Sequence, residues 1–159
     1  MVKVPGRRGP RLSIAGVVCY RPGIRGRLFY RQVIHRGRKN EPKGLRENDF
    51  ARLLDAAHQQ LSAPVILVWD KLPGHRSALM RQFIAARSWL RVYYLPAYAP
   101  ELNPAEGVWS SLRRAMGNLA ADTVTDLVAA AKTRLKRMQY HPSLIDGFLA
   151  ATGLSPPRP

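Results

Sequence analysis

The stretch VILVWDKLPGH, residues 65–75, decides the fold of this chain. Its first five residues are apolar, which is typical of a buried strand, and Asp70 closes the run. A second stretch, YLPAYAPELNPAEGVW at residues 94–109, carries Glu106. Asn103 and Pro104 predict the start of a helix, and Glu106 lies in its first turn. The two acids have 35 residues between them. A carboxylate at a strand end and one at a helix start can converge on a divalent metal, as phosphoryl transfer on nucleic acid requires.

These two stretches resemble the catalytic domain of bacterial insertion-sequence transposases related to the mariner elements. The resemblance rests on VWDKLPGH (68–75) and LPAYAPELNPAEGVWSSLRR (95–114), and it extends from about Leu12 to the end of the chain. It implies an α/β fold, the RNase H-like mixed sheet flanked by helices of the retroviral-integrase superfamily. It also implies a triad of acids that holds two Mg²⁺ or Mn²⁺ ions, with Asp70 and Glu106 as its second and third members.

One strand of that fold has no counterpart in the sequence. The family's domain starts with three antiparallel strands, and the first, central in the sheet, carries the first Asp of the triad. Only two β-type runs, residues 12–20 and 28–35, precede the first predicted helix. We therefore expect a domain without its first, central strand, a chain truncated at its amino terminus, and no catalytic activity in the chain alone. The acids before Asp70 lie in a polar loop or in that helix, so none of them can take the place of the first Asp of the triad: Glu41, Glu47, Asp49 and Asp55.

Each candidate site residue has a structural alternative. Asp70 could cap the turn after its strand, and Glu106 could close a capping box on Asn103. The resemblance favours the metal-ligand role for both acids. His75 could line the site or contact a phosphate, or it could bond locally at a helix start. Lys71 stands where the family usually has Asn, and it could contact a phosphate although a lysine repels a cation.

Two aromatic residues lie beside the second acid. Trp109 is expected in the core, where it would fix the helix that carries Glu106. Tyr98 could stack on an unpaired base. We expect it instead to pack beneath the turn between Pro96 and Pro100.

The chain is strongly basic, with 26 Lys and Arg against 10 Asp and Glu and a net charge of +16. This excess predicts a polyanionic partner, and the resemblance implies DNA, both transposon ends and target. Half of the basic residues lie within residues 1–46, of which 1–11 are expected to form an exposed basic arm. We expect DNA-backbone contacts from Arg7, Arg8, Arg11, Lys71, Arg113 and Arg114.

The length predicts one domain over residues 12–150, followed by a flexible tail over 151–159. The single cysteine, Cys19, excludes an internal disulfide, suits a reducing bacterial cytoplasm and lies in an apolar run, where we expect packing. No apolar run reaches the ~20 residues of a membrane span. By resemblance, intact family members can form homodimers.

Apolar spacing predicts the remaining elements. We expect helices within 50–61, with Asn48 or Asp49 as its cap, and within 75–87, 108–119, 124–138 and 144–149. A further short strand is expected at 91–95.

Two other functions stay open. A non-catalytic basic nucleic-acid-binding protein would use Asp70 and Glu106 structurally. A host RNase H-like nuclease, such as a resolvase, would need a full triad from elsewhere in the chain. The expected lack of a central strand also predicts marginal stability and aggregation through open edges, unless residues 2–4 replace that strand or the strand of Asp70 pairs with the hairpin.

Overall fold

The computed structural model describes residues 2–3, 10–117 and 123–154 as two small sheets and five helices. The first sheet is antiparallel and has the order β1 (Val2–Lys3), β2 (Arg11–Arg21), β3 (Ile24–His35). The second sheet is parallel and pairs β4 (Val65–Trp69) with β5 (Leu90–Tyr94). The helices are α1 (Glu47–Leu61), α2 (Ala78–Ala85), α3 (Ala105–Gly117), α4 (Val124–Tyr140) and α5 (Pro142–Ala150), with 3₁₀ turns at Pro73–His75 and Pro100–Leu102.

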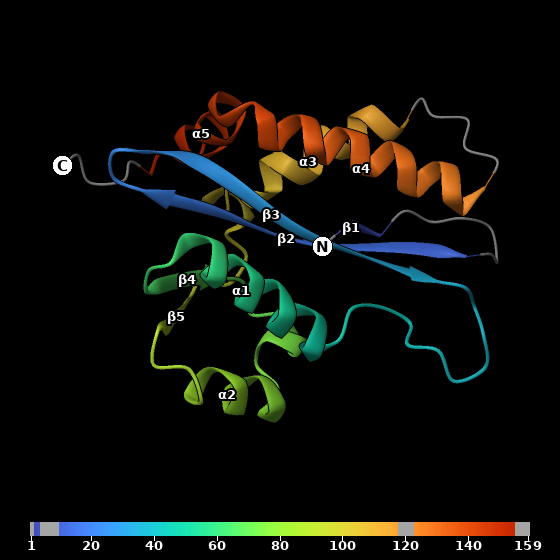
Figure 1. The fold of residues 1–159 in the computed structure, drawn as a ribbon, viewed down its shortest axis with the longest axis horizontal. Helices are drawn as coiled ribbons and strands as arrows, with labels where there is room; N and C mark the ends of the chain where they lie inside the picture. Colours follow the sequence, from blue (N-terminus) through green and yellow to red (C-terminus); the bar gives the residue numbers. More distant parts are fainter. Residues whose placement is uncertain (1, 4–9, 118–122, 155–159) are drawn as a thin grey trace.

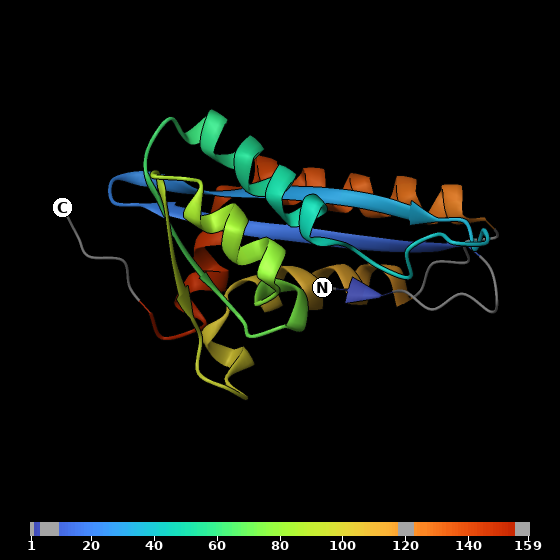
Figure 2. The same ribbon diagram turned by 90° about the horizontal axis from the view of Figure 1, so that it is seen from below.

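The β2–β3 hairpin forms the middle layer of the molecule (Figure 1). Helices α3, α4 and α5 lie on one side of it, and α1, α2 and the parallel sheet lie on the other. Figure 2 shows the same arrangement from below, with the hairpin running along the length of the molecule. Gly23 allows the tight turn between the two strands because its φ of 74° lies in the left-handed region.

The hairpin separates two apolar cores because successive side chains of a strand point to opposite faces. Leu12, Ile14 and Leu28 pack against the C-terminal helices, whereas Ala15 and Phe29 pack against α1. A third cluster joins α1 and α2 to the parallel sheet. Among the described strands, the two sheets therefore meet through helices and side chains, and not through strand pairing.

Polar contacts fasten the hairpin to the C-terminal helices. The hydroxyl of Tyr20 donates to the carbonyl of Ile145 at 2.8 Å, and the Gly26 N–H donates to the Asp146 carboxylate at 3.0 Å. A Cβ on Gly26 would lie 2.6 Å from that carboxylate oxygen, so only glycine fits this approach. These contacts fix α5 against the turn end of the hairpin.

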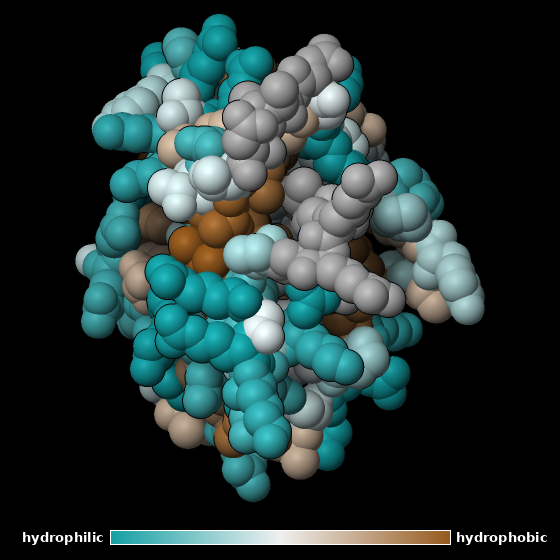
Figure 3. Space-filling model, turned by 90° about the vertical axis from the view of Figure 1, so that its right-hand side faces the viewer, coloured by the Kyte–Doolittle hydropathy of each residue, from teal (hydrophilic) through white to brown (hydrophobic). Residues whose placement is uncertain are grey.

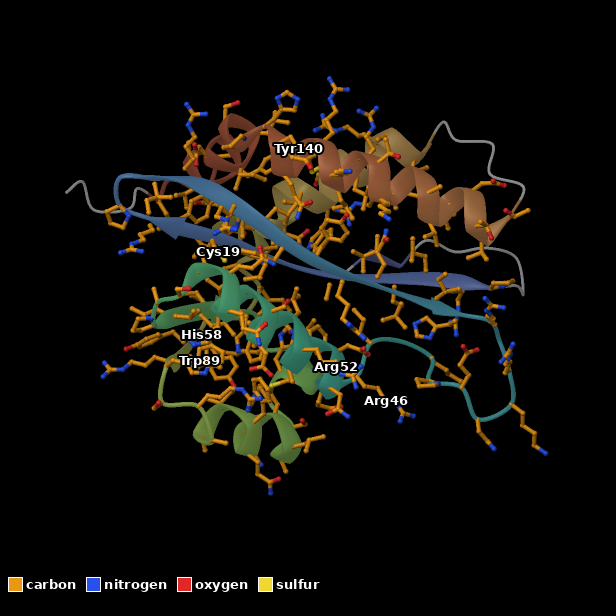
Figure 4. The ribbon with its side chains drawn as sticks, viewed as in Figure 1. Cys19, Arg46, Arg52, His58, Trp89 and Tyr140 are labelled. Carbon is orange, nitrogen blue, oxygen red and sulfur yellow. The ribbon has the colours of Figure 1, made fainter. Side chains whose placement is uncertain are left out.

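Two contacts hold α1 against the parallel sheet and α2. The rings of His58 and Trp89 stack at 3.9 Å with an interplanar angle of 1° (Figure 4). Arg87 binds the Asp55 carboxylate with two hydrogen bonds, of 2.8 and 2.9 Å. Such a bidentate pair fixes geometry as well as distance.

The predicted α/β class is confirmed, but the mixed sheet is divided. Val2 and Lys3 of the predicted basic arm pair with Ile14 and Ser13 of β2, so these two residues form a short strand of the first sheet. The sequence also left open that the strand before Asp70 pairs directly with the hairpin. This pairing does not occur among the described residues. The remainder of the predicted arm, residues 4–9, lies outside the described residues.

Several helix boundaries differ from the expected ones. The segment 75–87 begins as a 3₁₀ turn, and α2 starts only after Ser77, whose hydroxyl accepts the Met80 N–H at 3.2 Å. Helix α1 is preceded by Arg46, and Asp49 lies in its first turn, where its carboxylate accepts the Arg46 N–H at 3.0 Å. Neither predicted cap is therefore the N-cap. Residues 118–119 of the predicted third helix lie outside the described residues.

Among the residues that the structure describes, no helix has the length and apolar character to cross a membrane.

Candidate active site around Asp70 and Glu106

Asp70 follows β4 directly and has one of its two carboxylate oxygens engaged. Its Oδ1 accepts the Leu72 N–H at 3.1 Å and lies 2.8 Å from Nδ1 of His75. The predicted turn cap is therefore present. Oδ2 has no protein partner among the described hydrogen bonds, and 44% of the side chain is exposed. One oxygen is thus held in place while the other is available to a ligand.

His75 holds Asp70 from a buried position. The ring is only 8% exposed, stacks on Trp69 at 4.1 Å, and meets the edge of Phe50 at 4.8 Å. The Tyr94 hydroxyl donates to the His75 carbonyl at 3.1 Å. His75 thus bonds locally to Asp70 and lines the same pocket as that acid. Its contact with a phosphate stays a prediction.

The protonation of His75 follows from this burial. Burial lowers the pKa of His75, and the neighbouring Asp70 carboxylate opposes that effect without cancelling it. The ring is therefore neutral near pH 7, and Nδ1 carries the proton that is donated to Asp70.

The free energy of unfolding is expected to fall as the pH drops below the ordinary histidine pKa of about 6.5. Because the folded-state pKa of His75 is lowered, the unfolded chain binds its proton more tightly, and acid favours unfolding. His75→Asn keeps a side-chain N–H but does not titrate, so its urea-unfolding free energy should decline less between pH 7.5 and 5.5. His141→Asn, at an exposed position, is the matched control. An undiminished decline in His75→Asn would show that another group is responsible.

Glu106 lies in the first turn of α3 and is not used as a cap. Asn103 caps the helix through its Oδ1, which accepts the Ala105 N–H at 3.1 Å. The Asn103 N–H donates instead to Pro100, so the capping-box alternative is wrong. The Glu106 carboxylate is 40% exposed and lies 3.7 Å from Arg113.

Three of the four other acids before Asp70 are engaged elsewhere, and the fourth, Glu47, lies in the first turn of α1. Asp49 pairs with Arg31 at 3.0 Å and Asp55 with Arg87 at 2.8 Å, and Glu41 accepts the backbone N–H of Arg38 at 3.0 Å. In the described parts of the chain, no three His, Cys, Asp or Glu side chains form a group that could hold a metal ion. Asp70 and Glu106 thus remain the two oxygen donors that the sequence predicted.

The predicted DNA-contacting residues occupy different places. Lys71 and Arg114 are exposed, Arg113 faces Glu106, and Arg11 is half-buried at the start of β2. Arg7 and Arg8 lie outside the described residues. Figure 3 shows a largely hydrophilic surface at the right-hand end of the molecule. Sequence reasoning missed four further exposed cations that recur along α4: Lys132, Arg134, Lys136 and Arg137.

Both Tyr98 and Cys19 were expected to pack against other residues, and only Cys19 does so. Tyr98 is fully exposed and has a φ of 59°, so the prediction that it packs beneath the proline turn is wrong. Cys19 lies between the hairpin and α1 (Figure 4), and burial raises the pKa of its thiol to about 11. The side chain is therefore a neutral thiol used in packing.

These features define an α/β domain with carboxylates at a strand end and a helix start. Residues 3–128 match the family described as DDE superfamily endonuclease. Because this match spans most of the chain and both motifs, the chain belongs to the DDE superfamily endonuclease family. No curated protein matches the chain.

Solved structures of the Mos1 mariner transposase are similar in fold. Its catalytic domain has 13% identity and a TM-score of 0.47, over 92% of this chain and 83% of that one. The Mos1 transposase paired-end complex with the left transposon end has 13% identity and a TM-score of 0.52, over 89% of this chain and 55% of that one. At this identity, the second likeness supports the RNase H-like α/β fold alone.

Proposed function

We propose that this chain is the catalytic domain of a DDE-type transposase, and that Asp70 and Glu106 are two of its three metal-binding carboxylates. The observation that carries the proposal is the family match over residues 3–128, which includes both acids. The free Oδ2 of Asp70 and the release of Glu106 from helix capping support it.

The residues present fit a hard divalent cation in part. Carboxylate oxygens are the donors that Mg²⁺ and Mn²⁺ prefer, and both acids are partly exposed. Structures of the Mos1 catalytic domain with Raltegravir were obtained with Mg and with Mn. A bound ion would supply charge stabilisation and an activated water for DNA strand hydrolysis and for the transfer of the strand to target DNA. His75 would keep Asp70 oriented, since the Nδ1 contact of 2.8 Å leaves Oδ2 free.

DNA is the proposed partner. The net charge of +16 favours a polyanion, and exposed Lys71 and Arg114 lie close in sequence to the two acids. The Mos1 relative is described in complex with a transposon end. Such contacts to phosphates position DNA without reading its sequence.

We infer that the 159-residue chain binds DNA but does not cleave it. The family match covers Asp70 and Glu106, and the described residues gather no group of three His, Cys, Asp or Glu side chains that could hold a metal ion. The decisive measurement is nicking of supercoiled plasmid by the purified chain in Mg²⁺ or Mn²⁺, beside the Asp70→Asn and Glu106→Gln variants. Nicking above both variants would overturn the inferred inactivity, and it would support the metal-ligand role of the two acids.

A non-catalytic DNA-binding protein is the second candidate function. It is favoured by the finding that the described residues gather no three-ligand group. The two functions differ in Mn²⁺ binding, which electron paramagnetic resonance detects directly. Weak binding that Asp70→Asn removes supports the transposase assignment, whereas equal binding by wild type and variant supports the alternative.

Arg114→Ala is expected to lower the salt dependence of DNA binding. Each lost phosphate contact reduces the slope of log K against log salt concentration by about 0.9. Fluorescence anisotropy with a labelled duplex at several salt concentrations measures this slope. Arg52→Ala is the matched control, because Arg52 is also exposed but lies on α1, on the opposite side of the hairpin (Figures 1 and 4). Equal loss in both variants would contradict a role specific to Arg114.

A further inference from the structure

The loop that joins β3 to α1, residues 36–46, carries a dense and unbalanced charge. It lies at the end of the molecule whose surface is largely hydrophilic (Figures 1 and 3). It contains one acid, Glu41, and five basic residues, all of them exposed: Arg36, Arg38, Lys39, Lys43 and Arg46. Among the described residues, none of these five side chains forms an ion pair with an acid. The loop therefore presents five cations to a ligand.

Glu41 turns back onto the backbone of its own loop. Its carboxylate accepts the Arg38 N–H at 3.0 Å, and its own N–H donates to the Arg38 carbonyl at 3.1 Å. Hydrogen bonding from the backbone of Arg36, and then of Arg38 and Gly37, lowers the pKa of the Glu41 carboxyl. Three successive residues thus direct backbone N–H groups at one anion.

Residues 36–38 form the kind of concavity known as a nest, in which successive backbone N–H groups bind one anion. The conformation depends on Gly37, whose φ of 74° lies in the left-handed region that favours glycine. A Cβ on Gly37 would meet no atom within 4 Å. Glycine is therefore needed here for the backbone conformation and not for space.

A DNA phosphodiester has the properties that the nest requires of its occupant. Like the Glu41 carboxylate, it carries one negative charge and offers two oxygen atoms as hydrogen-bond acceptors. Backbone N–H groups and the side chains of Arg and Lys are the usual partners of DNA phosphates. The loop combines both kinds of donor, and its five cations have no acidic partner among the described residues.

We propose that residues 36–38 are a binding site for a phosphate of the DNA backbone, and that Glu41 occupies this site until DNA displaces it. The five cations of the loop hold the neighbouring phosphates. This inference rests on the proposed function where it names DNA as the ligand. The site itself lies outside both motifs, residues 68–75 and 95–114, that carry the two acids.

The loop lies on the same side of the hairpin as Asp70. Arg46 is where the loop meets α1 (Figure 4). In the next turn of α1, Phe50 meets the edge of the His75 ring at 4.8 Å, and His75 lies 2.8 Å from the Asp70 carboxylate. The loop, α1 and β4 all lie on one side of the hairpin (Figure 1). DNA that reaches Asp70 therefore approaches the side of the molecule that carries the loop.

Glu41→Gln should raise the affinity for a labelled DNA duplex about threefold to tenfold at low salt, because the neutral amide competes less well with a phosphate. The slope of log K against log salt concentration should steepen by about 0.9, the value for one more phosphate contact. Fluorescence anisotropy at several salt concentrations measures both quantities. Glu47→Gln is the matched control, because it makes the same change of charge in the first turn of α1, outside the nest.

Gly37→Ala tests the backbone conformation without changing any charge. Combined with Glu41→Gln, it should cancel most of the gain in affinity, because alanine disfavours the left-handed conformation of the nest. Gly44→Ala in the same background is the matched control. Gly44 lies in the same loop without a left-handed φ, and its added Cβ also meets no atom within 4 Å.

Inorganic phosphate tests the site without DNA. It should shift the amide NMR signals of Gly37 and Arg38 more in Glu41→Gln than in the wild type, and least in the double variant with Gly37→Ala. DNA binding that Glu41→Gln and Glu47→Gln raise equally, or a gain that Gly37→Ala leaves intact, would overturn the site and retain DNA as the partner of the chain. Phosphate-induced shifts without any DNA binding would retain the anion site and overturn DNA as its ligand.

Discussion

Replacement of Trp109 by Ala is expected to lower the free energy of unfolding by about 3–5 kcal/mol. The side chain is 3% exposed and lies in the core between the hairpin and the C-terminal helices. Its ring also fills the space beside Gly16, where a Cβ would lie 2.8 Å from it. The loss is a large part of the about 5–15 kcal/mol that stabilises a typical domain. The substitution also removes the side chain that anchors α3, the helix that carries Glu106, in the core.

Urea unfolding followed by circular dichroism measures the effect of Trp109→Ala. Tyr140→Ala is the matched control, because Tyr140 is also a large aromatic residue on a helix but is mostly exposed. Surface changes of this kind stay within about 0.5 kcal/mol. Equal losses in the two variants would show that Trp109 is not a core residue in solution.

The sequence was sufficient for features that depend on local pattern. The apolar run before Asp70 predicted the strand β4, and apolar spacing predicted α4 and the core position of Trp109. The expected burial of the whole run is wrong, because Ile66 and Val68 lie on an exposed face of the strand. The predictions of β4, α4 and Trp109 succeed because burial imposes a period of about two residues on strands and about 3.6 on helices. The α/β class follows from the order of such elements.

Features that depend on the exact path of a turn could not be predicted. The contact between His75 and Asp70 requires the 3₁₀ turn at Pro73–His75, which brings the ring back beneath the carboxylate. Tyr98 adopts a left-handed φ that places it in solvent, which no apolar pattern indicates. Leu79 fits the apolar spacing of α2 but is 51% exposed, because only one side of this short helix is covered.

The division into two sheets also escaped sequence reasoning in part. The sequence predicted one mixed sheet, whereas the described strands form two sheets that do not pair with each other. Strand formation by residues 2–4 was one of two ways in which the sequence allowed the missing strand to be compensated, and Val2 and Lys3 do pair with β2. A two-residue strand is too short to show an apolar pattern of its own, so whether residues 2–3 form a strand depends on long-range packing.

The isolated chain is expected to self-associate and to unfold below the about 45–65 °C that is usual for mesophile domains. In the part of the chain that the structure describes, β2 beyond Ile14 and β4 each have one edge without a strand partner, which offers unpaired backbone groups to other chains. Ile66 and Val68 add apolar surface beside that edge, with 68% and 53% of each residue exposed. Light scattering against concentration and a thermal unfolding curve test both expectations. A monomer with one cooperative transition above that range would contradict them.

The double change Ile66→Lys and Val68→Lys is expected to reduce this self-association and to leave the thermal midpoint nearly unchanged. Lysine on an edge strand opposes strand addition, because the incoming chain would bury its charge. Both side chains are exposed, so their replacement removes little from the core. Leu79→Lys with Leu144→Lys adds the same charge at exposed positions on α2 and α5, and should leave the association unchanged. If both pairs reduce light scattering equally, net charge and not the β4 edge controls association.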